Sequence, residues 1–512
     1  MIRFLLAMFA FVVASLASPA LADPADITAA SRSVVRIVIV ETDGTNVRYL
    51  GHGSGVAVAP DLVLTNAHVV EELRNDDTLL VGVVPSEGRS GYMARLVAYS
   101  PGNDLALLKL AEAGKITPAT FFSGQPADGS DVFAAGYPAN VDLAQGLDLS
   151  QIIRPSEAVK TRGSLSAGRS SNAFDTLLHT APIGAGNSGG PLLDACGRVI
   201  GINSFGTVSN NGTDASFFFA VSMREIARFL KQAGAAPHIT GLPCRSIADL
   251  DQAERERSAS EQARLAAEAQ ARGAADQQAR EKARTDAERQ VLTQRDNLLA
   301  LAAVLLVAAL AAGGGALVYS QRQNDRAMKI AGGVAVALLL GAVMAWLMRP
   351  SLDSIDERAE SLLPKPAASA SASGVADGAG KMVCVIDNDR SRITVSEGTD
   401  VPLEWSETGC VNGRTQYGLG GDGWSRILVP NGEETVSVAS YDPATQTYKV
   451  ERFLLGFDAM QKARAERGKF TPPQCSTGED GARRLGESQA AIRALLPPEP
   501  NERLLYHCKP AN

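Results

Sequence analysis

Three side chains in the first half of the sequence have the types that nucleophilic catalysis requires. Ser188 lies in the glycine-rich stretch APIGAGNSGGPL, His68 follows the apolar run VLTNA, and Asp104 precedes the apolar run LALLKL. A serine hydroxyl is a weak nucleophile until a neighbouring base accepts its proton and a third group orients that base. The residue types therefore indicate acyl transfer, with Ser188 as nucleophile, His68 as general base and Asp104 as the orienting group.

Each of these residues also has an ordinary explanation. A serine among glycines can be a simple loop, a histidine after a strand often bonds a backbone group, and Asp104 in GND suits a turn. What favours catalysis is the occurrence of all three contexts within one β-rich region. His52 lies in a turn-like stretch and His179 shortly before the serine loop, without the strand-end context of His68. We expect neither of these two histidines to be catalytic.

The elements that must position these side chains are short strands. From about Ile27 to Lys231, β-rich runs such as SVVRIVIV, TLLVGVV and GRVIGINSFG alternate with glycine, proline and asparagine turns. This pattern is typical of an all-β barrel or sandwich. The stretch SMREIARFLKQAG then predicts an amphipathic closing helix. Turns that follow strands expose side chains on a rigid scaffold, which is what a catalytic site needs.

The motifs TNAHVV, DLALLKL and GNSGGPL resemble those of trypsin-like serine proteases of the bacterial HtrA/Deg branch, and GHGSGVAV and GRVIGINSF are similar to that branch as well. The resemblance covers roughly residues 28–232. It implies a double β-barrel over residues 23–240, the triad named above, polypeptide substrates, and no cofactor or metal. It also implies an oxyanion hole from the backbone N–H groups of Gly186 and Ser188. HtrA-type proteases usually carry PDZ domains after the protease domain. No stretch after Lys231 resembles a PDZ domain, so the resemblance leaves open whether the protein forms a homo-oligomer.

Substrate preference is expected to depend on Pro182 and Ile183, which precede the nucleophile where trypsin-like folds line the pocket for the residue before the cut. The approach TAPIGAGN contains no acidic residue. A buried carboxylate would be needed to attract Lys or Arg, because an unpaired charge is costly to desolvate. The sequence therefore predicts a preference for small or medium apolar side chains.

Three apolar segments indicate export and membrane insertion. Residues 1–22 have the layout of a cleaved signal peptide, with an uncleaved anchor as the alternative. Residues 298–319 and 330–348 carry no charge and are long enough to cross a bilayer, although buried core helices would also be apolar. The intervening residues 320–329 contain three basic residues, which favours a cytoplasmic loop. We therefore expect a bacterial inner-membrane protein with both large domains in the periplasm.

The remaining segments differ sharply in composition. Residues 248–297 are rich in alanine and mixed charge and predict a helical stalk, with a partly disordered linker as the alternative. They lack a regular leucine heptad, so a stable coiled coil is not expected. Residues 349–381 predict a flexible linker and residues 382–512 a small α+β domain of unknown function. There, Trp405, Tyr417 and Trp424 could form either a binding face or a core.

The six cysteines suit an exported protein, because an even number outside the membrane runs suggests disulfides. Pairing within each domain predicts Cys196–Cys244 and leaves three arrangements for the other four, of which we favour Cys384–Cys410 with Cys475–Cys508. No cysteine or histidine spacing supports zinc. The net charge of −7 is spread out without a basic patch, which argues against a nucleic-acid partner.

Overall fold

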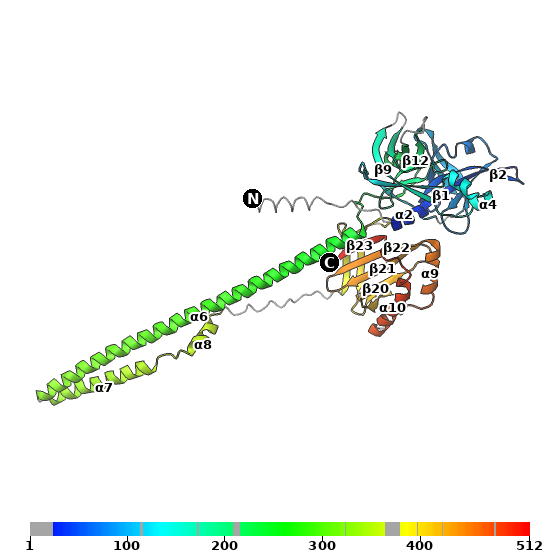
Figure 1. Cartoon of the computed structure of the whole chain (residues 1–512). Coiled ribbons are helices and arrows are strands. Elements are labelled where there is room, and N and C mark those ends of the chain that lie inside the picture. The colour runs from blue at the N-terminus through cyan, green and yellow to red at the C-terminus, as the bar shows by residue number, and fades with distance from the viewer. Residues whose placement is uncertain are drawn as a thin grey trace. The chain divides into compact units, whose positions relative to one another are not determined.

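The computed structural model describes residues 24–112, 116–170, 174–207, 216–322, 324–363, 379–396, 398–421, 423–475 and 478–511 (Figure 1). The predicted signal peptide, residues 1–22, lies outside these described residues. The chain divides into two compact units. The first contains Met1–Ala253 together with Ala376–Asn512, and the second contains Glu254–Val375.

Six strands close the first β-barrel, in the order β1-β2-β3-β6-β5-β4. β-Branched residues on alternate positions fill its interior, because successive side chains of a strand point to opposite faces. Val35, Ile37 and Ile39 of β1 are buried there. The strands are β1 (Val34–Thr42), β2 (Val47–Ala59), β3 (Leu62–Thr65), β4 (Leu79–Pro85), β5 (Tyr92–Ser100) and β6 (Leu105–Leu110).

Six further strands close a second barrel in the order β11-β8-β9-β10-β13-β12, and two short strands, β7 and β14, extend its sheet. These strands are β7 (Thr120–Phe122), β8 (Asp131–Gly136), β9 (Val159–Ser170), β10 (Asp175–His179), β11 (Pro191–Leu193), β12 (Val199–Gly206), β13 (Phe218–Ser222) and β14 (His238–Thr240). The helical segments of this region are α2 (Pro24–Ala30), η1 (Ser31–Ser33), η2 (Glu72–Arg74), η3 (Pro101–Asn103), α3 (Ala139–Gln145), α4 (Leu149–Ile152) and α5 (Met223–Gln232). The predicted double barrel and closing helix are confirmed.

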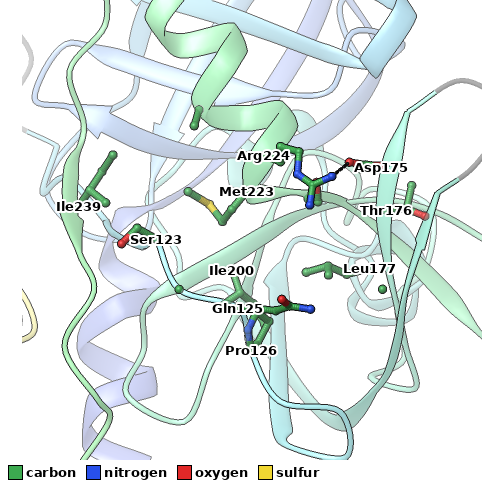
Figure 2. A pocket seen from close by; sticks show the side chains of 14 residues that line it. Ser123, Gln125, Pro126, Asp175, Thr176, Leu177, Ile200, Met223, Arg224 and Ile239 are labelled. Carbon is green, nitrogen blue, oxygen red and sulfur yellow. Dashed lines mark hydrogen bonds and ion pairs between the residues drawn. The ribbon is translucent and has the colours of Figure 1, made fainter.

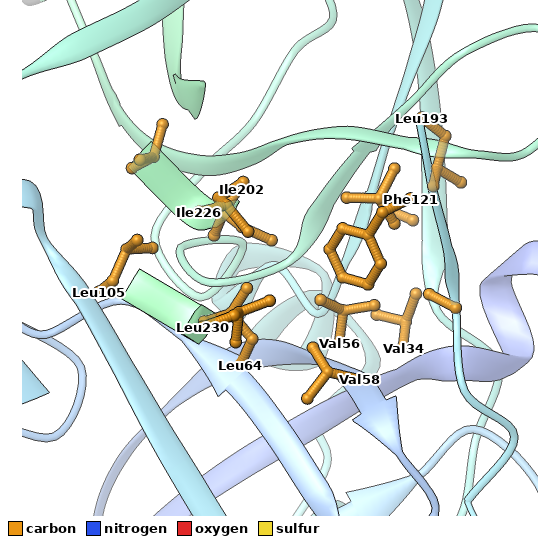
Figure 3. Close-up of a cluster of buried hydrophobic side chains, with 14 of the residues drawn as sticks. Val34, Val56, Val58, Leu64, Leu105, Phe121, Leu193, Ile202, Ile226 and Leu230 are labelled. Carbon is orange, nitrogen blue, oxygen red and sulfur yellow. The ribbon is translucent and has the colours of Figure 1, made fainter. Parts of the chain in front are cut away.

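A shared hydrophobic core joins the two barrels. Figure 3 shows Phe121 of the second barrel among Val34, Val56 and Val58 of the first, and Leu230 of α5 packs in the same cluster. Burial of such side chains contributes roughly 1.5–3 kcal/mol each. The two barrels are thereby held in a fixed relation, which is what allows loops from both to build one site.

In the second unit, the 75-residue helix α6 (Ile247–Gln321) continues without a break from the predicted stalk through the first apolar segment. Helix α7 (Asp325–Leu347) follows, and Leu299 and Leu306 of α6 line one surface with Leu339 and Trp346 of α7. Both helices are long and apolar enough to cross a membrane. Helix α8 (Ser354–Leu362) lies within the segment predicted as a flexible linker, so that prediction was wrong for these residues. Its short run of Glu, Arg, Ala and Leu favours helix over coil.

The C-terminal domain is a nine-stranded sheet in the order β18-β17-β16-β15-β23-β22-β21-β20-β19. Met460 of α9 and Ile492 of α10 pack on it with Val436 and Phe453. Its elements are β15 (Gly380–Ile386), β16 (Val401–Trp405), β17 (Cys410–Val411), β18 (Thr415–Gln416), β19 (Gly418–Gly420), β20 (Gly423–Leu428), β21 (Thr435–Asp442), β22 (Thr447–Leu454), α9 (Phe457–Arg467), α10 (Gly478–Arg493) and β23 (Glu502–Pro510).

The aromatic residues of this domain form core, not a surface. Trp405 and Tyr417 are buried with their rings edge to face, and Trp424 packs against the same cluster. Edge-to-face packing is the arrangement that aromatic rings favour. The binding-face alternative for these three residues is therefore not supported.

The six cysteines form three disulfides, and two of the three predicted pairings are corrected. Cys196–Cys244 forms as predicted. The other four cysteines pair as Cys384–Cys508 and Cys410–Cys475 instead of Cys384–Cys410 and Cys475–Cys508. The reason is strand order: the last strand, β23, returns to pair with β15, and Cys384 lies directly opposite Cys508. That strand order joins the first and last cysteines of the domain and leaves Cys410 and Cys475 to pair with each other.

Within the first unit, the segment before β1 contacts the C-terminal domain. Arg392 donates to the Asp26 carboxylate at 3.2 Å, and Asn501 Nδ2 donates to the same oxygen at 3.1 Å. Asp26 and Arg392 are only 3% and 4% exposed. The Glu87 carboxylate also accepts a 2.8 Å hydrogen bond from Phe457 N at the start of α9. A buried ion pair tolerates loss of either partner poorly, because the other charge is then left uncompensated.

Candidate active site

Strand pairing brings His68 and Asp104 together. β3 and β6 are antiparallel neighbours with Thr65 opposite Ala106, His68 follows β3, and Asp104 directly precedes β6. His68 Nδ1 lies 3.0 Å from each oxygen of the Asp104 carboxylate, and the His68 backbone N–H donates to it at 3.1 Å. A carboxylate accepts, so Nδ1 carries the proton and Nε2 presents its lone pair. This tautomer is the one that a general base needs.

Asp104 is held tightly from several directions. Its side chain also accepts a hydrogen bond from Ser204 Oγ at 2.5 Å, and its backbone carbonyl accepts one from Asn66 Nδ2 at 2.8 Å. Its φ of 51° lies in the left-handed region, which is uncommon outside glycine and often found at functional sites. Burial raises the pKa of Asp104, but the hydrogen bonds from His68 and Ser204 outweigh it and lower the pKa overall. The carboxylate is thus kept ionised.

The serine loop between β10 and β11 is fixed against β2 and β12. Ser188 O accepts from Ser54 N at 2.9 Å, Gly186 O accepts from Ser54 Oγ at 2.7 Å, and Gly189 N donates to Asn203 O at 2.8 Å. Gly186 and Gly189 have φ values of 95° and 90°. A Cβ at Gly186 would lie 2.3 Å from Tyr137 O, so both conformation and space require glycine there.

The Ser188 hydroxyl donates to Ser204 O at 2.9 Å. Among the described residues, no hydrogen bond joins it to His68, and the N–H groups of Gly186 and Ser188 donate to none of the described acceptors. Rotation about the Ser188 side-chain bond would turn the hydroxyl away from Ser204. The two free N–H groups have the chemistry needed to bind developing negative charge.

The predicted pocket residues lie on the approach to this loop. Ile183 is half-buried against the hydrophobic cluster of the second barrel, whereas Pro182 is exposed. Pro182 O accepts a 2.6 Å hydrogen bond from Thr161 Oγ1 of β9. A Cβ at Gly163 would lie 2.1 Å from Ala181 N, so β9 packs directly on the segment that precedes the serine. The approach is therefore supported by a strand and not free to move.

His179 and His52 lie apart from the Asp104 carboxylate, and each has its own environment. His179 is completely buried in β10, and its ring nitrogens have no hydrogen-bond partner that the described residues supply. Burial lowers the pKa of His179 to about 4, and the nearby Ala181 backbone and Asn203 side chain offset only part of that effect. His52 lies behind Gly186, with Nε2 2.8 Å from Tyr137 O.

A separate cavity of about 610 Å³ lies on the second barrel, and Figure 2 shows it. Its walls include Leu177, Ile200 and Met223, and the Arg224–Asp175 ion pair of 2.8 Å lies at the same place. None of the triad candidates lines this cavity. In the described part of the chain, no group of three or more histidine, cysteine and acidic side chains has the arrangement of a metal site.

Sequence reasoning missed two residues that complete the site, Ser54 and Ser204. Ser54 lies in the GHGSG stretch of β2 and fixes the serine loop, while Ser204 of β12 bonds both Asp104 and Ser188. Both lie in stretches whose resemblance to proteases was already evident. Ser54 precedes the apolar run GVAVA and Ser204 follows VIGIN, but nothing in one sequence says which strand faces the site.

Two closed six-strand barrels, with a His–Asp pair and a glycine-flanked serine between them, define a trypsin-like serine peptidase domain. Residues 53–202 match the family model described as the trypsin-like peptidase domain. Over this domain the chain is similar to serine proteases of the HtrA/Deg type, and the matched domain is that of a trypsin-like peptidase.

Named relatives share this domain. Serine protease Rv3671c of Mycobacterium tuberculosis is 31% identical over 219 residues, covering 42% of this chain and 50% of that protein. The magnetosome formation protease MamE of Paramagnetospirillum magneticum is 32% identical over 197 residues, 37% of this chain and 24% of that protein. The crystal structure of the active form of Rv3671c protease is 26% identical, covers 44% of this chain and 94% of that one, and gives a TM-score of 0.32. The chain spans half or less of the length of these two curated relatives.

Proposed function

We propose that this protein is a membrane-tethered serine endopeptidase that hydrolyses exported or misfolded polypeptides through a Ser188–His68–Asp104 triad. The observation that carries the proposal is the contact of His68 Nδ1 with Asp104 at 3.0 Å, made by the loops that flank β3 and β6. This contact orients the histidine proposed as the base, and Ser204 bonds both Asp104 and the glycine-flanked Ser188. The family match of residues 53–202 supports the same reaction class.

In the proposed reaction, Ser188 Oγ turns from Ser204 O towards His68 Nε2 and attacks the scissile carbonyl carbon. His68 accepts the hydroxyl proton, and the Asp104 carboxylate stabilises the resulting imidazolium. His68 then donates that proton to the leaving amine as the C–N bond breaks, which leaves an acyl-enzyme. A water molecule, deprotonated by His68, then attacks the ester carbonyl. As the ester C–O bond breaks, His68 returns the proton to Ser188 Oγ, and the new carboxyl terminus is released.

The oxyanion hole would come from the N–H groups of Gly186 and Ser188. Neither N–H group donates to a described acceptor, and Gly186 has a left-handed φ of 95°. Removing one such donor typically reduces the rate by roughly 100- to 1000-fold. The glycines around Ser188 thus have a mechanistic use in addition to a conformational one.

Membrane tethering is supported by α7 and by the apolar C-terminal part of α6, which are joined by a short segment that includes Arg322 and Asn324. The contact of Arg392 with Asp26 also supports an inference about membrane topology. Two domains that pack together must lie on the same side of a membrane, and an even number of crossings between them allows this. We therefore propose that both domains lie on the periplasmic side of a bacterial inner membrane, with the α6–α7 connection in the cytoplasm.

A fluorophosphonate probe tests the activity directly, because it labels only a serine that an adjacent base activates. The full-length protein in detergent is expected to be labelled at Ser188, and Ser188→Ala is expected to be neither labelled nor active on unfolded casein. Ser204→Ala is a matched control, since it removes a nearby hydroxyl but not the nucleophile.

The competing reading is a membrane scaffold that uses the protease fold only to bind peptides. One observation favours this alternative: the Ser188 hydroxyl donates to Ser204 O and not to His68. Absence of labelling in a folded wild-type protein, together with unchanged peptide binding in Ser188→Ala, would favour the scaffold.

A further inference from the structure

A second histidine is buried directly behind the serine loop. The His52 side chain is only 2% exposed. Its Nε2 lies 2.8 Å from Tyr137 O and its Nδ1 2.5 Å from the Tyr49 hydroxyl. A carbonyl oxygen can only accept, so Nε2 is the protonated nitrogen and Nδ1 accepts from Tyr49. Burial lowers the pKa of His52, which favours this neutral form.

A buried ion pair lies beside the same ring nitrogen that contacts Tyr137 O. Asp142 of α3 lies 3.4 Å from His52 Nε2, and its other oxygen accepts from Arg36 of β1 at 2.9 Å. Arg36 is 3% exposed and also donates to Ile152 O at 2.8 Å. The Asp142 oxygen that faces His52 has no hydrogen-bond partner among the described residues. These charged groups limit where the imidazole can lie.

The group that His52 holds is in contact with the proposed oxyanion hole. Tyr137 O would lie 2.3 Å from a Cβ on Gly186, and His52 Nε2 itself would lie 2.9 Å from it. Two residues further, Ala139 N donates to Ala185 O at 2.8 Å. The segment 137–139 therefore forms the surface on which the peptides at Ala185 and Gly186 rest.

We propose that His52 is a positioning residue that fixes the Tyr137 carbonyl and thereby holds the Gly186 N–H in the geometry that binds the oxyanion. This inference rests on the proposed function, in which Gly186 is an oxyanion donor. His52 does not touch substrate. It acts by donating to a buried carbonyl that would otherwise turn to find a donor, since an unpaired buried acceptor is unfavourable.

The test compares three substitutions at His52 in the full-length protein. In His52→Gln, the side-chain amide can still donate to Tyr137 O, and its oxygen can still accept from Tyr49. His52→Leu has a similar volume but no polar group. His52→Asn keeps an amide but is too short to reach Tyr137, and it replaces the leucine variant if that one does not fold. Circular dichroism and the unfolding midpoint check folding in each case.

In His52→Leu and His52→Asn, loss of the donor to Tyr137 O is expected to lower kcat by roughly 10- to 100-fold, with little change in KM. This loss is smaller than the roughly 100- to 1000-fold caused by deleting an oxyanion donor itself. His52→Gln should recover kcat to within a few fold of wild type. Affinity for a peptide boronate, whose tetrahedral oxygen occupies the oxyanion hole, should fall in parallel with kcat. Affinity for the matching product peptide should not change.

Each other outcome has a distinct meaning. Wild-type kcat in folded His52→Leu or His52→Asn overturns the positioning role, and so does a loss of kcat without loss of boronate affinity. An equal loss in His52→Gln would also count against it, because the hydrogen bond is retained there. If Ser188→Ala remains active, the proposed function fails instead, and that result is independent of every His52 variant.

Discussion

Asp104 shows how much of the proposed catalysis depends on one residue. Its carboxylate accepts from His68 Nδ1, from the His68 backbone N–H and from Ser204 Oγ. Asp104→Asn would present an amide donor to Nδ1 and so favour the tautomer with the proton on Nε2, which cannot act as base. We expect kcat to fall by roughly 10,000-fold in peptide hydrolysis. Ser204→Ala removes one of the three bonds and is expected to cost far less. Similar losses in the two variants would mean that the tautomer is not what Asp104 controls.

The burial of His179 predicts how the stability of the folded protein changes with pH. Its folded-state pKa of about 4 lies below the ordinary value of 6.5, because burial disfavours the charged ring. The neutral ring is therefore favoured by folding. The stabilisation that the neutral His179 ring gives the folded state is fully present above about pH 6.5 and is lost as the pH falls towards 4. Since one pKa unit corresponds to 1.36 kcal/mol, about 3 kcal/mol should be lost over this window.

Hydrogen exchange measured by mass spectrometry can follow the opening free energy of β10 from pH 7 to pH 4 in the full-length protein. The matched variant is His179→Gln, which does not titrate. The carboxylates that protonate near pH 4 are common to both proteins, so the difference between their profiles isolates His179. Parallel profiles for wild type and variant would contradict the prediction.

At the scale of elements, the approach to Ser188 sets the expected cleavage preference. Ile183 packs against the second barrel, and β9 holds the segment in place through Thr161 and Gly163. A pocket walled by an isoleucine and free of acid should favour Val, Ala or Ile before the cut. The preference should be broad, because one methylene in such a pocket changes the free energy by only about 1–3 kcal/mol.

Cleavage-site profiling of a denatured substrate protein measures this preference. In Ile183→Ala, the wider pocket should shift the cuts towards Leu and Phe, with total activity retained. Pro182→Ala is the control, because Pro182 is exposed and its backbone carbonyl remains available to Thr161. A clear majority of wild-type cuts after Lys or Arg would refute the proposed pocket.

The strands of the C-terminal domain predict its disulfide pattern. Cys384 and Cys508 lie opposite each other on β15 and β23, and Cys410 of β17 is bonded to Cys475. Non-reduced digests of the exported protein should yield peptides joined by these two bonds and by Cys196–Cys244. Loss of Cys384–Cys508 should destabilise the domain by about 2–5 kcal/mol, since it closes a long loop. Peptides joining Cys384 to Cys410 would show that the pairing of β15 with β23 is wrong.

At the scale of the whole molecule, the contact between Arg392 and Asp26 links topology to folding. Helices α6 and α7 separate the two residues in sequence, so the proposed double crossing must return the chain to the side from which it left. An alkaline phosphatase fusion after Ala511 should therefore be active, and one after Asn324 should be inactive. Green fluorescent protein at the same two positions should give the opposite pattern. Phosphatase activity at Asn324 alone would reverse the proposed orientation.

The sequence by itself determined the class of chemistry and the sequence of domains. His68, Asp104 and Ser188 are recognisable because each sits where an apolar run meets a turn, which is a local pattern. The barrel strands and the two apolar helices can likewise be predicted from short-range patterns of hydrophobic residues. The same holds for Cys196 and Cys244, because only these two cysteines precede the two apolar helices, which leaves one pairing.

Only the tertiary structure decided which distant residues meet. The Cys384–Cys508 bond, the placement of Ser204 against Asp104 and the position of His52 behind Gly186 depend on which strands become neighbours. Strand order follows from how whole sheets bury their apolar faces, a property of the complete chain and not of any short stretch. The GHGSGVAV stretch that contains His52 does not itself show that His52 meets the serine loop. That contact exists because β2 packs against the loop.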